Sequence, residues 1–399
     1  MLRLDRRSFL AAAGAWVCQA LGTGLTMTQA GTRGLHSGPD DIRGRVMRGG
    51  GPPEIWRWSH EGLFYRHLEG QSVQCLICPN RCVLHPGDRS VCRSRVNHGG
   101  KLYSLAYGNP CAVHIDPVEK KPLYHFMPGS RVFSLATTGC NFRCLNCQNW
   151  EISQARPEDV RSQDLFPEAA VARATTANAR AIAYTYAEAI TFYEFMSDIA
   201  RQARARGLAN LLVSNGYINP EPLELLCDQL DGANINLKSF SNATYRKLNG
   251  GTLQPVLECL KTLHRRAVHF EITTLVVPGY VDDAIMIREM CAWIRETLGR
   301  DHPLHFNRFF PRYKLDRLPA TPIATLERFR QIALEEGLHY VYIGNVPLHE
   351  ANHTYCHACG RMLIERAGYH IPTYELRGDQ CRFCDQKIPG IWSAGSAPP

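Results

Sequence analysis

The 399-residue sequence lacks several features that define large classes of protein. Beyond its N-terminal segment it has no run of roughly 18 or more apolar residues, so the body of the chain is not predicted to span a membrane. It also lacks a basic block, because the net charge of +8 is spread along the chain. A solvated basic surface accounts for that charge without a nucleic-acid partner. The apolar content of 45% and charged content of 21% are ordinary for a globular protein.

Cysteine, in contrast, is unusually abundant. Most of the 16 cysteines lie in three tight groups. These are Cys75, Cys78, Cys82 and Cys92; Cys140, Cys144 and Cys147; and Cys356, Cys359, Cys381 and Cys384. Cysteines two or three residues apart suit metal chelation better than a disulfide framework, which usually joins distant segments. The sequence therefore predicts three metal sites.

The middle group has one thiol fewer than a four-iron cluster normally takes. A 4Fe–4S cluster is usually held by four cysteine thiolates. The triplet Cys140, Cys144 and Cys147 would leave one iron open to another ligand. An open coordination position distinguishes reactive metal sites from structural ones. We therefore predict a reactive 4Fe–4S cluster at this triplet.

The other two groups each offer four thiols. The N-terminal group has the spacing Cys-x2-Cys-x3-Cys-x9-Cys, and the C-terminal group has the double Cys-x2-Cys spacing of a zinc ribbon. Zinc and a further iron–sulfur cluster both accept four thiolates, so the metal is left open at both sites. Disulfides are the alternative for the N-terminal group if the protein is exported.

The pattern of residues divides the chain into five segments. They are a signal-like segment at 1–34, a linker at 35–53, a Cys-rich module at 54–130, a barrel segment at 131–346 and a metal-knuckle tail at 347–399. In the barrel segment, short apolar runs alternate with amphipathic ones. The predicted strands are 132–137, 181–186, 209–214, 233–238, 269–277, 304–309 and 340–344, and the predicted helices are 167–178, 189–206, 220–229, 243–266, 283–298 and 321–336.

Alternating strands and helices imply parallel strands joined by right-handed crossovers. About six such units predict an α/β fold with a partial (β/α)6-type TIM barrel. In these barrels the chemistry lies at the carboxyl ends of the strands. The cysteine triplet directly follows the first predicted strand, 132–137.

The N-terminal segment resembles a twin-arginine export signal. Arg6-Arg7 would be the arginine pair, with Phe9-Leu10 and a mildly apolar stretch at 11–25 after it. Twin-arginine export carries folded, cofactor-loaded proteins, which suits an iron–sulfur protein. We therefore expect a periplasmic or signal-anchored protein. A cytoplasmic protein with a vestigial leader is the alternative.

The spacing of the cysteine triplet resembles that of the radical S-adenosylmethionine (SAM) superfamily. Other segments resemble the AmmeMemoRadiSam-system branch, which is related to pyruvate formate-lyase activating enzyme. They are 116–126, 184–188, 214–217, 271–279 and 305–311, and the resemblance runs from about 55 to 390. It implies that SAM binds the open iron of the cluster. An electron from a flavodoxin- or ferredoxin-like donor would then release a 5′-deoxyadenosyl radical, and AmmeMemoRadiSam-system proteins are the implied partners.

The resemblance also implies roles for single residues. Glu188 would hold the amino group of SAM through a charge-assisted hydrogen bond, although a glutamate at a helix start also interacts with the helix dipole. Further candidates for the SAM pocket or the substrate mouth are Ser214, Asn215, Asn236, Lys238, Thr273, His305 and Arg308. Ala187, Ala189 and Asn236 depart from the pattern of that branch.

Three functional hypotheses follow from these motifs. The first is a radical SAM enzyme that abstracts hydrogen from an unidentified substrate. The second is an activase for a glycyl radical enzyme. The third is an exported metal-binding or electron-transfer protein without SAM chemistry, which the substitutions at Ala187, Ala189 and Asn236 favour.

Overall fold

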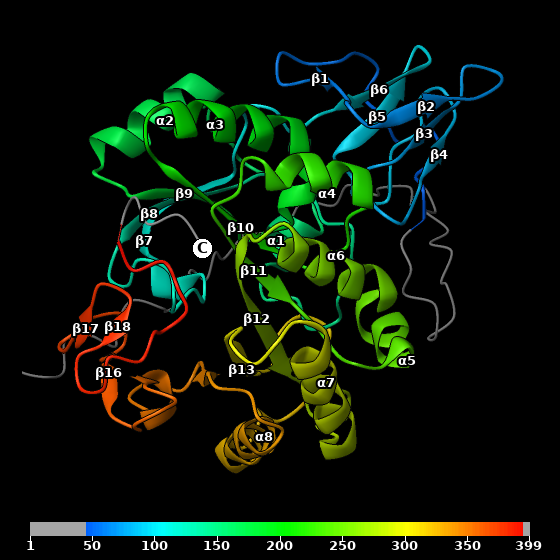
Figure 1. Ribbon diagram of the computed structural model, residues 1–399. Helices are drawn as coiled ribbons and strands as arrows, with labels where there is room; N and C mark the ends of the chain where they lie inside the picture. The colour runs from blue at the N-terminus through cyan, green and yellow to red at the C-terminus, as the bar shows by residue number, and fades with distance from the viewer. Residues whose placement is uncertain (1–44, 394–399) are drawn as a thin grey trace, which may run out of the picture. The chain divides into compact units, whose positions relative to one another are not determined.

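The computed structural model of the protein describes residues 45–393 (Figure 1). The predicted twin-arginine signal at 1–34 lies outside the described residues, as does the first part of the predicted linker. No helix in the described part of the chain has both the length and the apolar character needed to cross a membrane.

The central element is an eight-stranded sheet with the strand order β14-β13-β12-β11-β10-β9-β8-β7. Its strands are β7 (Ala112–Pro117), β8 (Arg131–Ala136), β9 (Ala181–Tyr184), β10 (Ala209–Ser214), β11 (Gly232–Asn236), β12 (His269–Val276), β13 (Leu304–Arg308) and β14 (Val341–Gly344). Neighbours from β8 to β14 are parallel, and β7 is antiparallel to β8. This confirms the predicted α/β fold. Within residues 45–393 no ladder joins β7 to β14, so the sheet is open.

Helices connect the parallel strands and follow one another around the sheet in chain order (Figure 1). They are α2 (Pro167–Thr176), α3 (Tyr193–Ala205), α4 (Pro220–Cys227), α6 (Gln254–Arg265), α7 (Ala284–Thr297) and α8 (Ile323–Glu335). Every residue of β9 is buried, as expected for a parallel strand that is covered on both faces. Strand β9 is therefore packed on both of its faces.

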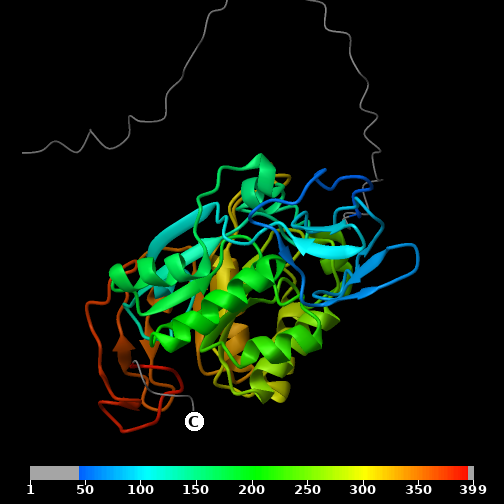
Figure 2. The same ribbon diagram turned by 90° about the horizontal axis from the view of Figure 1, so that it is seen from above.

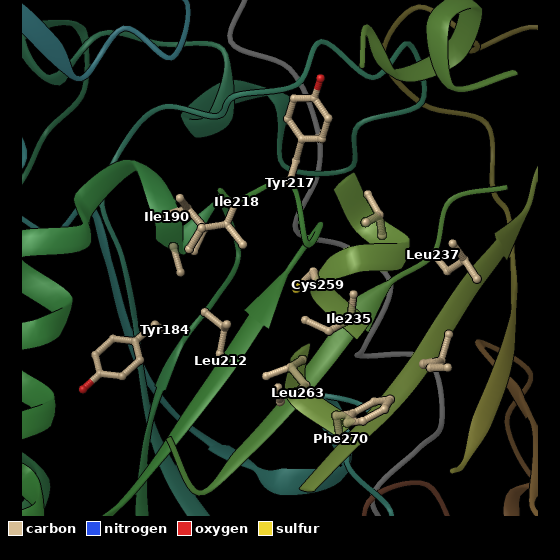
Figure 3. Close-up of a cluster of buried hydrophobic side chains, with 14 of the residues drawn as sticks. Tyr184, Ile190, Leu212, Tyr217, Ile218, Ile235, Leu237, Cys259, Leu263 and Phe270 are labelled. Atoms are coloured by element: carbon tan, nitrogen blue, oxygen red, sulfur yellow. The ribbon is translucent and has the colours of Figure 1, made fainter. Parts of the chain in front are cut away.

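The core lies between the sheet and these helices. Leu212 of β10, Ile235 of β11 and Phe270 of β12 lie in the same apolar cluster as Cys259 and Leu263 of α6 (Figure 3). Each fully buried aliphatic or aromatic side chain contributes about 1.5–3 kcal/mol to folding. This packing holds the carboxyl ends of the strands in place.

The N-terminal cysteine module is built from two small antiparallel sheets. One contains β1 (His60–Glu61), β6 (Lys101–Ser104) and β5 (Arg95–His98), and the other contains β2 (Tyr65–His67), β3 (Val73–Cys75) and β4 (Val83–Leu84). A buried ion pair fastens the module to the barrel. The Arg95 guanidinium donates to both carboxylate oxygens of Glu194 in α3, at 2.9 and 2.7 Å.

The C-terminal segment forms two hairpins and returns to the barrel. Their strands are β15 (Thr354–Tyr355), β16 (Met362–Ile364), β17 (Leu376–Arg377) and β18 (Gln380–Cys381). Ile391 pairs with the backbone of 125–127, and the buried His125 ring bonds the Pro389 carbonyl and the Tyr342 hydroxyl. In both views the hairpins and the N-terminal module lie on opposite sides of the central sheet (Figures 1 and 2).

The prediction of one helix over 243–266 is wrong. The segment forms a short turn, α5 (Asn242–Thr244), a π-helix, Tyr245–Asn249, and then α6. Gly250, which adopts a left-handed φ of 77°, ends the π-helix. Such π-helical turns occur frequently at functional sites.

The strand β7 was not predicted. Only one of its six residues is buried, because it lies at the sheet edge, and Pro117 ends it. An exposed edge strand has no regular apolar alternation by which to recognise it, and proline is tolerated there. The barrel sheet therefore extends in the N-terminal direction beyond residue 131, to Ala112.

The buried Arg95–Glu194 pair gives a test of how the module is attached. We expect Arg95→Met to lower the free energy of unfolding by about 3–5 kcal/mol, because it leaves the Glu194 carboxylate buried without its cation. Urea unfolding of the full chain measures this. Lys101→Met, which removes the exposed Lys101–Glu61 pair of the same module, is the control and should leave stability nearly unchanged. Equal losses in the two variants would contradict the argument.

Candidate active site

The carboxyl ends of the parallel strands surround a cavity of about 560 Å³. All three sulfurs of the central triplet belong to residues that line it. The other predicted residues that line it are Glu188, Ser214, Asn215, Asn236, Lys238 and Thr273. All of these residues except Thr273, which lies within β12, end or follow one of the strands β8 to β11, so the topology brings them together from distant parts of the sequence.

The cysteine loop is anchored on the π-helical segment. The backbone N–H groups of Arg143 and Leu145 donate to the carbonyls of Asn249 and Leu248, at 2.7 and 2.9 Å. Phe142 is fully buried, and a Cβ atom at Gly251 would come within 2.2 Å of its ring. The cysteine loop therefore packs against, and is hydrogen-bonded to, the segment where the helix is interrupted, an interruption that the sequence did not predict.

Hydrogen bonds also reach the sulfurs themselves. The amide nitrogen of Asn249 donates to Cys144 Sγ at 3.2 Å, and the backbone N–H of Phe142 donates to Cys140 Sγ at 3.4 Å. Cys147 Sγ lies 3.1 Å from Ser153 Oγ. Such bonds stabilise thiolate ligands and tune the potential of a bound cluster.

Burial raises the pKa of the Cys140 and Cys147 thiols. Without a metal these thiols therefore keep their protons. A bound metal would displace those protons, since metal binding requires thiolates.

Glu188 is the buried carboxylate of the site. One of its oxygens accepts from Ser214 Oγ at 2.7 Å, and the other accepts from the backbone N–H of Asn215 at 2.9 Å. Burial raises the pKa of Glu188, and these hydrogen bonds offset the rise only in part. A cationic ligand such as an ammonium group would stabilise the ionised form. The arrangement therefore fits the predicted contact with the amino group of SAM.

Several polar atoms of the cavity wall have no protein partner. They are Asn146 Oδ1, Thr273 Oγ1 and Asn307 Oδ1, each buried and without a hydrogen bond within the described residues. An unsatisfied buried polar atom costs about 1–3 kcal/mol. Their presence in one cavity is what a site for a polar ligand such as SAM requires.

Two predicted residues do not line this cavity. His305 lies deeper on β13, where its Nε2 bonds Glu271 Oε2 at 2.6 Å and its ring stacks on Tyr342. Arg308 lies on the opposite face of the same strand, because successive side chains alternate, and its Nε donates to the Thr321 carbonyl at 2.8 Å. The expectation that these two residues form the SAM pocket or the substrate mouth is therefore not supported by the geometry, which gives both a structural role.

The cavity also contains residues that the sequence analysis missed. They are Lys120, Asn146, Gln148, Asn149, Asn234, Asn307, Asn345 and Tyr369, among others. Asn307 and Asn345 sit at or just after the ends of β13 and β14, so the rule that chemistry gathers at strand ends applies to them. Tyr369 comes from the C-terminal hairpins, and no local signal places it there.

The segment 116–126 supports the mouth of the cavity. Asp116 accepts hydrogen bonds from Lys120 at 2.8 Å, from Lys121 at 2.5 Å and from the Tyr186 hydroxyl. Burial alone would raise the pKa of Asp116, but these donors lower it overall. Tyr186 has a left-handed φ of 64°, which a bulky residue adopts only where its surroundings impose it. Asp116 therefore positions the loop that carries Glu188.

The C-terminal cysteines converge on one point. The ligand atoms of Cys356, Cys359, Cys381 and Cys384 all lie within 4.8 Å of one another. Two of the sulfur pairs are 3.7 Å apart. Four thiolates at 2.3 Å from a tetrahedral zinc ion are about 3.8 Å apart, so this set fits zinc. Asp385, where a knuckle glycine was expected, adopts a left-handed φ of 58° similar to that of Gly360, so the knuckle is kept.

The N-terminal cysteines are free thiols that line a separate, smaller cavity. The disulfide alternative for this group therefore has no support in the structure.

A cysteine triplet after the first parallel strand, with a buried glutamate after the second, is the arrangement expected of an iron–sulfur enzyme on an open, partial α/β barrel. The chain belongs to the radical SAM superfamily, whose members use a 4Fe–4S cluster and SAM. The family model described as "Radical SAM superfamily" matches residues 134–291. An uncharacterized protein of Methanocaldococcus jannaschii is 45% identical over 330 residues, which cover 82% of this chain and 98% of that protein.

Two further comparisons involve activating enzymes. Pyruvate formate-lyase 1-activating enzyme of Escherichia coli is 26% identical over 226 residues, which cover 53% of this chain and 91% of that enzyme. A crystal structure of a domain of pyruvate-formate lyase-activating enzyme from Bacteroides vulgatus has a TM-score of 0.37 and 16% identity. That match covers 41% of this chain and 99% of the domain. Both similarities are distant.

The sulfur geometry predicts the metal of the C-terminal set. We expect Cys384→Ser to remove about one zinc ion per chain, because zinc held by four thiolates loses a ligand. Metal analysis measures the zinc, and hydrogen exchange should show faster exchange in the hairpins at 354–388. Cys111→Ser, at a cysteine outside all three groups, is the control and should keep the zinc. A Cys384→Ser protein that retained its zinc and its slow exchange would contradict the assignment.

Proposed function

We propose that the protein cleaves SAM reductively and uses the resulting radical to abstract hydrogen from a substrate held in the same cavity. The observation that carries this proposal is that Cys140, Cys144, Cys147 and Glu188 line one cavity at the carboxyl ends of the strands. A 4Fe–4S cluster bound there with SAM would supply the 5′-deoxyadenosyl radical. A one-electron donor of the flavodoxin or ferredoxin type would start the reaction.

The residues after β8, β9 and β10 form the side of the cavity that suits SAM. The triplet would supply the three thiolates, and Glu188 would bind the ammonium group of SAM. Ser214 and the backbone of Asn215 hold the Glu188 carboxylate in position. Lys238, two residues after the end of β11, also lines the cavity, and its ammonium group would bind a carboxylate.

The residues at or just after the ends of β13 and β14 suit the substrate. Asn307 belongs to β13 and Asn345 is the residue after β14, and these are the last two strands at the edge of the sheet that is far from β9. Tyr369, from the C-terminal segment, also lines the cavity. Gly344 leaves the space that Asn307 occupies, since a Cβ atom there would meet Asn307 Oδ1 at 1.9 Å. Amide and hydroxyl groups favour a polar substrate group that both accepts and donates hydrogen bonds.

Activation of a glycyl radical protein is the second candidate function. The similarity to the Escherichia coli activating enzyme favours it, but that similarity covers 53% of this chain. It therefore cannot account for the whole of the two additional cysteine modules. A stable radical on a partner protein, detected by electron paramagnetic resonance, would support this candidate over a small-molecule reaction.

The proposal predicts SAM cleavage that depends on the triplet. We expect the anaerobically reconstituted full chain to form 5′-deoxyadenosine from SAM with dithionite. Cys144→Ala should reduce the rate by more than about 100-fold and remove about four irons per chain, because one of three thiolates is lost. Chromatography of the nucleoside and iron analysis measure both effects. Cys111→Ala is the control and should match the unsubstituted protein. No cleavage by an iron-loaded protein would instead favour a metal-binding or electron-transfer role.

A second prediction concerns Glu188. We expect Glu188→Gln to weaken SAM binding by about 10-fold or more, since a charge-assisted hydrogen bond contributes about 1.5–3 kcal/mol. Calorimetry on the cluster-loaded protein measures this, and the iron content should not change. Glu296→Gln, at an exposed carboxylate outside the cavity, is the control.

The same substitution has a defined effect on stability. Because the folded-state pKa of Glu188 is raised, its ionised form opposes folding. This destabilisation is absent below the unfolded-state pKa and develops as the pH rises through the folded-state pKa. Glu188→Gln should therefore not lower the unfolding free energy of the ligand-free protein at neutral pH. A large loss would identify Glu188 as a structural residue.

A further inference from the structure

The N-terminal cysteines differ from the C-terminal ones in how their sulfurs are spaced. In the part of the chain at 45–393, the C-terminal set is the only group of three or more ligand atoms that all lie within 4.8 Å of one another. Cys75, Cys78, Cys82 and Cys92 therefore do not converge as zinc ligands do. They line a cavity of about 20 Å³ between them. One water molecule needs about 10–15 Å³ of such a cavity, so the four cysteines are not packed directly against one another.

A wider set of sulfurs around a space is what a cubane cluster requires. Its four thiolates bind four separate irons, whereas the thiolates of a zinc site bind one ion. The sulfurs of the central triplet, like those of the N-terminal set, do not all lie within 4.8 Å of one another. The two sets of cysteines therefore resemble each other and differ from the zinc-like set.

The two sets are also in direct contact. The Asn80 side chain, between Cys78 and Cys82, donates to the Asn141 carbonyl at 2.9 Å, next to Cys140. Ser94 Oγ donates to the Thr138 carbonyl at 2.8 Å. Gly139 packs so closely on the turn at 91–94 that a Cβ atom there would lie 2.5 Å from the Cys92 carbonyl. These two hydrogen bonds therefore connect the segments that carry the two sets of cysteines.

Positive charge lies between the two sets. The Arg143 guanidinium donates to the carbonyls of Cys140 and Val91, the residue before Cys92. Arg93 has an unpaired buried nitrogen, and both guanidiniums interact electrostatically with Cys92 and Cys140. Neither has a carboxylate partner among the described residues. Four thiolates with a cubane core carry net negative charge, so clusters on both sides would compensate these cations.

We propose that Cys75, Cys78, Cys82 and Cys92 hold a second iron–sulfur cluster in electronic contact with the cluster of the central triplet. The second cluster would accept one electron from a flavodoxin- or ferredoxin-like donor and pass that electron to the first, with no bond made or broken. This relay role rests on the proposed function, whereas the binding of the cluster does not.

Iron and sulfide analysis of three anaerobically reconstituted full-length proteins tests the site. We expect about eight irons and eight sulfides per chain in the unsubstituted protein, since each cubane holds four. The triple variant Cys140→Ala, Cys144→Ala, Cys147→Ala should keep about four irons, and Cys78→Ser/Cys82→Ser should also keep about four. Zinc should stay at about one ion per chain in all three.

Two outcomes would overturn the proposal. One is a triple variant without iron. The other is a Cys78→Ser/Cys82→Ser protein that keeps all its iron and loses a zinc ion, which would identify a second zinc site. The triple variant leaves the N-terminal module intact, so the test does not depend on whether the Cys78→Ser/Cys82→Ser protein folds.

Electron paramagnetic resonance tests the contact between the clusters. With dithionite, the unsubstituted protein should show a signal split by coupling between two reduced clusters, and each variant should show an unsplit signal. A spectrum equal to the sum of the two variants' spectra would contradict the contact. Failure of the proposed function is distinguishable, because it would appear as two intact clusters without formation of 5′-deoxyadenosine from SAM.

Discussion

The structure depends on one topological constraint, namely that parallel strands joined by crossovers all end at the same edge of the sheet. Seven strands of the central sheet, β8 to β14, obey it. Cys140, Glu188, Ser214 and Lys238 are far apart in the sequence, yet each comes at or just after a strand end. The buried apolar faces of the strands fix these ends, so the polar residues at the edge need little stabilisation of their own.

The cysteine loop needs additional support, because it has little regular structure and must present three sulfurs to one side. Backbone hydrogen bonds to Leu248 and Asn249 provide that support, and the Asn249 amide also reaches Cys144 Sγ. The helical structure is interrupted between Asn249 and Gln254, directly after the two residues whose carbonyls accept these bonds. A regular helix would bond its own carbonyls and leave none for the loop. The irregular helical segment at 245–249 therefore holds the cysteine loop in place.

Sulfur spacing separates the three cysteine groups more clearly than sequence spacing does. The C-terminal set is compact enough for one ion, whereas the sulfurs of each of the other two sets do not all lie within 4.8 Å of one another. The N-terminal module also packs directly against the loop of the central triplet through Asn80 and Ser94. A buried ion pair between Arg95 and Glu194 holds that module in place. The module is thus part of the surroundings of the active site.

The sequence alone determined the superfamily, the parallel α/β fold and nine of the residues that line the cavity near β8 to β12. It did so because a short cysteine motif and the alternation of strands and helices are local patterns. Only the tertiary structure decided that His305 and Arg308 lie apart from the cavity, since that depends on depth along β13 and on which face of the strand each residue occupies. It also decided that Tyr369 joins the cavity and that the two four-cysteine sets differ. These features depend on distances between segments that are remote in the chain, and no local pattern encodes such distances.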